Sequence, residues 1–305
     1  MATTRKIVKV FKSKPTLEGA GVHLKRAFGF TETKLFDPFL LLDDFRGDSP
    51  EMYQKGFPWH PHRGIETITY VLRGKVAHGD SLGNSGVIGV GDVQWMTAGS
   101  GIIHQEMPSG DAEGKMYGFQ LWANLPRKDK MIDPHYQGVV DSEIPRVKQE
   151  NGVEIRVICG EAGGKRGPVE NVTIQPEYLD VSVPSQSIFT HELPADHTAL
   201  AYVFEGSGIF CDDLDPFDYD VEGANYFDTE RKAQLGNTSL ILFGPGDQVK
   251  VTTTDSSVRF LLFSGRPIRE PVAWYGPIVM NTAAELRVAF DELEQGTFIK
   301  YRGSK

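Results

Sequence analysis

The sequence predicts an all-β protein built from two copies of one β-barrel, with a single short helix near the C-terminal end. Three observations carry this prediction. Short apolar runs recur between glycine and proline turns along most of the chain, which is typical of a sandwich or barrel. One strand–turn–strand pattern occurs in each half. Helical periodicity is almost absent before residue 281, so helices contribute little to the predicted core.

The strands expected in the first half are rich in β-branched and aromatic residues, which favour a pleated, half-buried surface. The copy of the repeat in the first half of the chain consists of ETITYVLRGKV followed by GVGDVQWMTAGSGIIH. In both segments a hydrophobic strand meets a glycine turn. The strands are expected at 6–11 (KIVKVF), 66–72 (ETITYVL), 87–96 (VIGVGDVQWM) and 117–125 (YGFQLWANL).

The second half repeats this pattern as ALAYVFEGSGIF followed by LILFGPGDQVKVTT. The segment LPRKDKMIDPHYQGVVDSEIPR between the halves is polar, contains prolines and lacks a strand pattern, as domain boundaries often do. The sequence therefore predicts an N-terminal barrel over 1–135 and a C-terminal barrel over 136–305. Further strands are expected at 153–160, 178–184, 198–206, 239–253 and 258–265.

The expected helix lies in NTAAELRVAFDELEQG. Thr282 and Glu285 have the spacing of a capping box, in which each residue's side chain accepts from the other's backbone N–H. Leu286, Phe290 and Leu293 fall on one face, and Gly296 is a stop signal. We expect this helix to close the C-terminal domain and pack against a barrel.

Composition narrows the classes of function. The 305 residues carry a formal net charge of -9, which argues against a nucleic-acid-binding surface spread over the whole protein. No apolar run approaches the roughly 18 to 20 residues needed to span a bilayer, and no apolar core follows the N-terminus as in a secretory signal. With only Cys159 and Cys211, a reducing compartment is expected. We therefore expect a cytoplasmic protein, or also a nuclear one in a eukaryote.

Two short motifs carry the chemistry. His60 and His62 stand two apart in FPWHPHRGIETITY, and His104 and Glu106 stand two apart in GSGIIHQEMP. Side chains two apart on a strand share a face. A lone pair of strand histidines more often consists of hydrogen-bonded or exposed side chains, but two such pairs on neighbouring strands would converge on one point. Imidazole with carboxylate suits Fe, Mn, Ni, Cu or Zn.

These motifs resemble those of the cupin superfamily, and more closely those of the pirin family of bicupins. The landmarks FDPFLLLDDF, FPWHPHRGIETITY, GDVQWMTAGSGIIHQEMP, FQLWANLP, GPIVMNT and AFDELEQGTF occur in pirin order. The resemblance implies two tandem cupin barrels of the double-stranded β-helix (jelly-roll) type. It also implies a metal, usually iron and as Fe²⁺, held in the N-terminal domain by His60, His62, His104 and Glu106. The C-terminal domain is expected to lack a metal site.

Glu66 is the one alternative ligand. Cupins commonly use a glutamate a few residues after the histidine pair, and Glu66 follows His62 by four residues. Because pirins use the later glutamate instead, we expect Glu66 to orient a histidine ring, with direct ligation as the less favoured alternative.

The remaining histidines carry weaker expectations. His191 and His197 stand six apart in the second repeat, which does not match a metal pair. His23, His78 and His135 are expected on the surface or in loops. Met107, Trp95, Phe57 and Trp59 flank the ligand motifs and could line an apolar cleft, although aromatic residues there are more often core.

The resemblance implies an oxidoreductase of the quercetin 2,3-dioxygenase type, acting on a flavonol and O₂ with ring opening and loss of carbon monoxide. Glu106 would be the catalytic base that accepts the proton of the flavonol 3-hydroxyl. The alternative is an iron-containing redox sensor without turnover, either a transcriptional co-regulator or a modulator of a metabolic enzyme, with a protein partner. Neither membrane binding nor direct sequence-specific nucleic-acid binding is expected.

Overall fold

The computed structural model describes residues 2–212, 214–222 and 231–301. The chain forms two compact units. The first barrel unit comprises residues 14–143 and 268–305, and the second barrel unit comprises residues 1–13 and 144–267. These bounds differ from the contiguous division into 1–135 and 136–305, because the N-terminal strand joins the later barrel and the C-terminal segment joins the earlier one.

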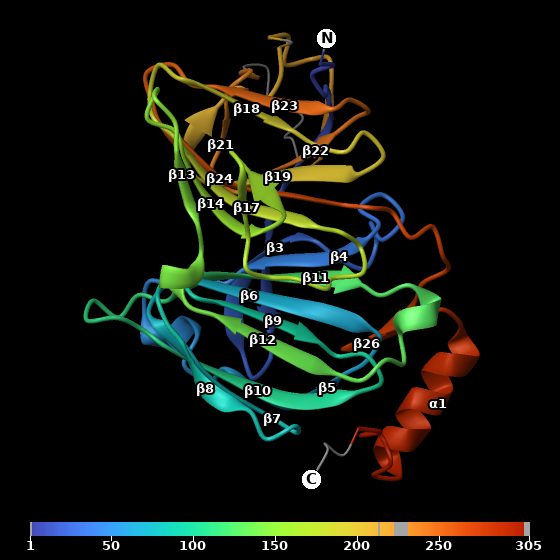
Figure 1. The fold of residues 1–305 in the computed structure, drawn as a ribbon. Helices are drawn as coiled ribbons and strands as arrows, with labels where there is room; N and C mark the ends of the chain where they lie inside the picture. Colours follow the sequence, from blue (N-terminus) through green and yellow to red (C-terminus); the bar gives the residue numbers. More distant parts are fainter. Residues whose placement is uncertain (1, 213, 223–230, 302–305) are drawn as a thin grey trace. The chain divides into compact units, whose positions relative to one another are not determined.

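The first barrel unit contains two main sheets (Figure 1). The seven-stranded sheet has the order β12-β9-β6-β11-β4-β3-β2, and the four-stranded sheet has the order β5-β10-β7-β8. Both consist of antiparallel pairs, as expected of a jelly-roll barrel. Their bounds are β2 (Lys14–Glu18), β3 (Val22–Phe28), β4 (Phe39–Asp44), β5 (Phe57–His62), β6 (Ile65–Arg73), β7 (Lys75–Asp80), β8 (Ser85–Ile88), β9 (Val93–Thr97), β10 (Ile102–Ser109), β11 (Tyr117–Asn124) and β12 (His135–Val139).

The strands with the strongest β pattern lie in the middle of the seven-stranded sheet. In β6 the first seven residues are buried, and all five residues of β9 are buried. Buried polar side chains on these strands, such as Thr69 and Gln94, must find partners inside the barrel because unpaired buried polar groups are unfavourable. The sequence-predicted strands 66–72 and 117–125 correspond to β6 and β11.

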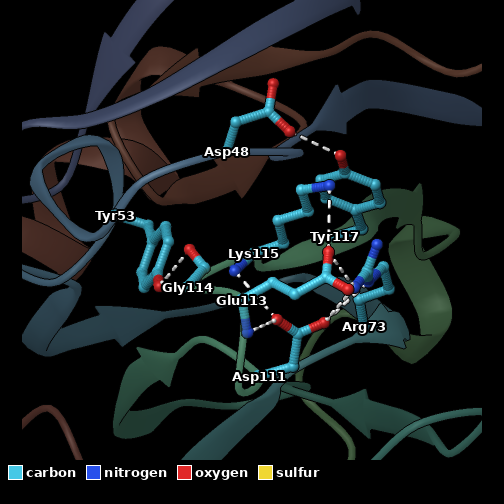
Figure 2. Close-up of polar contacts among 8 residues, drawn as sticks. All are labelled: Asp48, Tyr53, Arg73, Asp111, Glu113, Gly114, Lys115 and Tyr117. Carbon is cyan, nitrogen blue, oxygen red and sulfur yellow. Dashed lines mark hydrogen bonds and ion pairs between the residues drawn. The ribbon is translucent and has the colours of Figure 1, made fainter.

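The loop that connects β10 in the four-stranded sheet to β11 in the seven-stranded sheet is held by a cluster of partly exposed polar contacts (Figure 2). Asp111 accepts hydrogen bonds from the backbone N–H groups of Glu113 at 2.9 Å and Lys115 at 3.1 Å. Arg73 donates to Asp111 and Glu113, and the Tyr53 hydroxyl donates to the Gly114 carbonyl. Exposed ion pairs of this kind contribute little stability each, but together these contacts hold the conformation of the loop between β10 and β11.

The second barrel unit contains a nine-stranded sheet of order β13-β14-β17-β24-β19-β22-β1-β20, in which β21 pairs with β19. Two smaller sheets consist of β18 with β23 and β15 with β16. The bounds are β1 (Ile7–Lys12), β13 (Arg146–Lys148), β14 (Glu154–Cys159), β15 (Glu161–Ala162), β16 (Lys165–Arg166), β17 (Glu177–Val183), β18 (Ile188–Glu192), β19 (Thr198–Gly208), β20 (Asp220–Glu222), β21 (Leu235–Gly236), β22 (Ser239–Phe243), β23 (Gln248–Thr252) and β24 (Val258–Gly265).

Apolar side chains fill the second barrel unit. In the repeat, β18 and β23 occupy the places that β5 and β10 occupy in the first unit. There Phe189 lies opposite Val251 and His191 lies opposite Val249. The His191 Nε2 lies 2.6 Å from the Glu177 carboxylate. The prediction of two tandem barrels with one C-terminal helix is thus confirmed for the fold.

The C-terminal segment of the first barrel unit contains β25 (Ala273–Tyr275), β26 (Ile278–Met280) and helix α1 (Ala283–Glu294). The predicted capping box is present, with Thr282 Oγ1 accepting from the Glu285 N–H and Glu285 Oε2 accepting from the Thr282 N–H. The helix ends before Gly296, whose φ is +69°. Among the described residues, no helix is long and apolar enough to cross a membrane.

Two buried basic side chains attach this segment to the barrel. Arg63 donates to the Ser100 and Phe298 carbonyls at 2.8 Å each, and pairs with Glu292 at 2.8 Å. Lys130 Nζ donates to the carbonyls of Gly64 and Val279 and to the side chain of Asn124. These contacts explain why α1 belongs to the first barrel unit although it follows the second along the chain.

Candidate metal centre

The two histidine motifs lie on paired strands, β5 and β10. The antiparallel register places His60 directly opposite His104, and His62 opposite Ile102. Residues opposite each other in a register share a face, so all three imidazoles point to one side. Pro61 separates the two β5 histidines without disrupting a ladder, because β5 is the edge strand of its sheet.

The three imidazoles form a compact cluster. One ring nitrogen from each of His60, His62 and His104 lies within 4.8 Å of the others. The ring centroids are 4.4 to 5.0 Å apart. Two nitrogens bound side by side to one metal at about 2.1 Å each would lie about 3 Å apart; the Nε2 atoms of His60 and His62 are 3.1 Å apart.

Backbone carbonyls set the tautomers of the two β5 histidines. His60 Nδ1 lies 2.8 Å from the Pro58 carbonyl, and His62 Nδ1 lies 3.2 Å from the Pro277 carbonyl. Because a carbonyl only accepts, each Nδ1 carries the proton and each neutral ring keeps a lone pair on Nε2. Two lone pairs then face each other, an arrangement that a metal cation between them would stabilise.

His104 is the most deeply buried member of the cluster, with no exposed surface. Neither of its ring nitrogens has a hydrogen-bond partner among the residues that the structure describes. Burial, and then the neighbouring His62 and His60, hold the pKa of His104 well below its usual range. Burial and His60 likewise lower the pKa of His62. Neutral imidazoles with unused nitrogen lone pairs are the form that binds metals, so these residues fit a divalent metal.

Glu106 lies two residues beyond His104 but outside the group of atoms within 4.8 Å. Its carboxylate accepts a hydrogen bond from Thr69 Oγ1 at one oxygen and from Gln120 Nε2 at the other, both at 2.8 Å. An irregularity in the β5–β10 register falls between His104 and Glu106, which lies opposite Phe57. Ligation by Glu106 therefore stays a prediction.

Among the described residues, the Glu66 carboxylate makes no hydrogen bond to the ring of His60, His62 or His104. It accepts a hydrogen bond from Thr97 Oγ1 at 2.8 Å instead. Thr97 Oγ1 also lies 3.2 Å from His135 Nε2. Burial raises the pKa of Glu66 to about 7, against the opposing effect of the Thr97 hydrogen bond. Glu66 is outside the three-imidazole cluster as well.

His78 was expected on the surface or in a loop, and this expectation is wrong. It lies on β7 and is 5% exposed. Gln94 Nε2 lies 3.0 Å from His78 Nδ1, and the His78 and His104 ring centroids are 5.6 Å apart. The alternation of β7 turns His78 inward, next to the cluster. His135 is half-buried on β12, whereas His23 is exposed on β3.

A cavity of about 430 Å³ opens beside the cluster and includes His60 and His62 in its lining. Apolar and aromatic side chains make most of its wall, a composition typical of small-molecule sites. Phe57 lines it as predicted, but Trp59, Trp95 and Met107 do not. Other lining residues come from β2–β4, β11 and the β25–β26 hairpin, among them Arg26, Asp43, Gln120, Trp122, Trp274 and Pro277.

Sequence reasoning missed several of these residues because their elements lie far from the histidine motifs. Trp122 Nε1 donates to Gln120 Oε1 at 3.1 Å, and Gln120 in turn donates to Glu106. Gln120 and Trp122 both occur in FQLWANLP, where a glutamine on a buried strand was the available signal. For Pro277, whose carbonyl faces His62, the sequence offers no such signal.

Comparisons with known proteins point to one protein family along most of the chain. Residues 21–123 match the family model "Pirin", and residues 178–299 match "Pirin C-terminal cupin domain". A pirin-like protein of Caulobacter vibrioides is 41% identical, covering 96% of this chain and 99% of its own length. Pirin of Rattus norvegicus is 38% identical, with 95% and 92% covered. A crystal structure of quercetin 2,3-dioxygenase from Acinetobacter baumannii has a TM-score of 0.83 and 31% identity, with 97% and 99% covered.

Proposed function

The chain belongs to the pirin family, and from this premise we propose that it is a metal-dependent dioxygenase for flavonols, of the quercetin 2,3-dioxygenase type. The observation that carries the proposal is the three-imidazole cluster of His60, His62 and His104 beside an aromatic-lined cavity. The name of the Acinetobacter structure supports this activity over others.

In this proposal His60, His62 and His104 hold iron, and Glu106 completes the set. Bound iron would supply a Lewis acid that stabilises the flavonolate oxygen. The protein supplies the rest. The Pro58 and Pro277 carbonyls keep the β5 imidazoles in the metal-binding tautomer, and burial keeps His62 and His104 neutral.

Glu106 is the proposed general base for the proton of the flavonol 3-hydroxyl. A carboxylate can accept at more than one lone pair on each oxygen, so the hydrogen bonds from Thr69 and Gln120 leave it able to accept another.

The test is loss of quercetin absorbance by the iron-loaded protein in air, with carbon monoxide measured as product. We expect turnover by the wild type and no stoichiometric metal in His62→Ala. Glu106→Gln should lower kcat roughly a hundredfold or more while retaining some metal. The control is His23→Ala, because His23 is an exposed histidine outside the cluster.

Two results would contradict the proposal. Full metal content in His62→Ala would exclude the ligand assignment, and unchanged turnover in Glu106→Gln would exclude the base. Stoichiometric iron without turnover, together with partner binding that depends on the iron oxidation state, would favour the redox-sensor function instead.

A further inference from the structure

One wall of the cavity carries a charged group that the proposed chemistry does not use. Glu18, Arg26 and Asp43 all line the cavity, from β2, β3 and β4. Arg26 Nε and one terminal nitrogen donate to the two oxygens of Asp43, at 2.9 and 2.7 Å. The other terminal nitrogen pairs with Glu18 Oε1 at 2.8 Å. The register places Arg26 directly opposite Asp43.

The net charge of this wall is negative. Arg26 contributes one positive charge that is always present, and two carboxylates surround it. Each of the three nitrogens of Arg26 directs one N–H to these carboxylates, which uses three of its five N–H donors. The Glu18 and Asp43 side chains are 41% and 7% exposed, and each carboxylate oxygen keeps a lone pair that can accept from a ligand. The wall therefore accepts hydrogen bonds and repels anions.

The rest of the cavity selects a flat ligand. Phe30 and Trp274 stack with centroids 3.9 Å apart, and Trp122 lies 5.9 Å from Trp274. All three line the same cavity as the charged wall. A ring bound against these aromatics would lie beside a wall of two carboxylates, whose Arg26 already directs one N–H from each nitrogen to them.

We propose that the Glu18–Arg26–Asp43 wall is a specificity determinant that admits aromatic ligands carrying neutral hydroxyl donors and rejects aromatic ligands carrying a carboxylate. The inference rests on the proposed function in placing an aromatic substrate in this cavity. Beyond that function, the inference states which substituents on the substrate the cavity accepts. The residues that decide this are neither metal ligands nor the proposed base.

The experiment measures binding to the metal-free protein by quenching of tryptophan fluorescence, so that it needs neither metal nor turnover. Three probes share one ring system: 3-hydroxyflavone, its catechol-bearing analogue and its carboxyphenyl analogue. For the wild type we expect the Kd of the carboxyphenyl analogue to be about tenfold or more above that of 3-hydroxyflavone, because a unit charge interacts strongly with its neighbours in a partly buried site. The catechol analogue should bind severalfold more tightly than 3-hydroxyflavone.

Two variants of Glu18 test the cause. Glu18→Gln keeps an acceptor and removes one negative charge, so the carboxylate penalty should shrink to about threefold or less. Glu18→Lys makes the wall net positive, and the carboxyphenyl analogue should then bind more tightly than 3-hydroxyflavone. Glu51→Gln is the matched control, since Glu51 is exposed and outside the cavity lining. It should leave the ratio of the two Kd values unchanged.

The inference is overturned if the carboxyphenyl analogue binds the wild type as well as 3-hydroxyflavone does. It is also overturned if both Glu18 variants retain the wild-type ratio, or if none of the three probes binds. Discrimination without turnover by the iron-loaded protein would refute the proposed function alone. Turnover without discrimination would refute this inference alone.

Discussion

Replacing His104 by Leu should stabilise the metal-free protein while abolishing its metal site. His104 has no exposed surface, and within the described part of the chain both of its ring nitrogens lack a hydrogen-bond partner. A buried polar group without a partner typically lowers the free energy of unfolding by about 1–3 kcal/mol. Leucine is a similarly sized apolar side chain that needs no partner. We therefore expect metal-free His104→Leu to be more stable than metal-free wild type by about 1–3 kcal/mol.

The metal should reverse this order. A ligand present at a hundred times its Kd stabilises the folded state by about 2.7 kcal/mol, and only the wild type can gain this from three imidazoles. Loaded wild type should then be as stable as the variant or more so. The assay is urea unfolding after chelator treatment, and again with excess metal. Tryptophan fluorescence reports the first barrel unit alone, because Trp59, Trp95, Trp122 and Trp274 all lie in it.

The reasoning is refuted if metal-free His104→Leu is less stable than metal-free wild type by more than about 1 kcal/mol. That result would mean that the imidazole nitrogens are satisfied in the folded protein. The matched control is His191→Leu in the second barrel unit, where Nε2 has a carboxylate partner at 2.6 Å; its urea unfolding is followed by circular dichroism, because all four tryptophans lie in the first barrel unit. This variant should not stabilise the protein, since it removes a satisfied interaction.

Three further outcomes are expected. The pKa of Glu66 is raised to about 7 in the folded protein from 4.5, so between these pH values the folded protein keeps a proton that the unfolded chain has lost. The free energy of unfolding of the metal-free wild type, relative to that of metal-free Glu66→Gln, should therefore fall by about 3 kcal/mol from pH 4.5 to pH 8. A difference in urea unfolding that does not change with pH would contradict this. Gln120→Leu removes the donor to Glu106 and the acceptor for Trp122. It should lower the free energy of unfolding by about 1–3 kcal/mol and should also lower turnover. A free energy of unfolding equal to that of the wild type would show that neither contact stabilises the protein. Arg63→Leu should release the C-terminal segment by leaving the Ser100 and Phe298 carbonyls unpaired; limited proteolysis should cleave α1 faster than in the wild type, and an unchanged cleavage rate would argue against this attachment.

Local patterns were sufficient to predict much of the protein. The short apolar runs between glycine and proline turns predicted β6 and β11, and the Thr282–Glu285 spacing predicted the start of α1. The strand rule predicted that His60 and His62 share a face. These features depend on residues within a few positions of one another, whose relation is set by backbone geometry.

The tertiary structure decided what depends on pairing between distant strands. The sequence alone predicted the metal-ligand motifs, but the register of β5 and β10 brings His104 opposite His60, while Thr69 and Gln120 hold the Glu106 carboxylate. Long-range pairing also places His78 of β7 opposite Glu106 of β10, places α1 with the first barrel unit and builds the cavity wall from β2–β4. Chain order does not determine such contacts, because each is selected by the packing of the whole barrel rather than by the residues beside it.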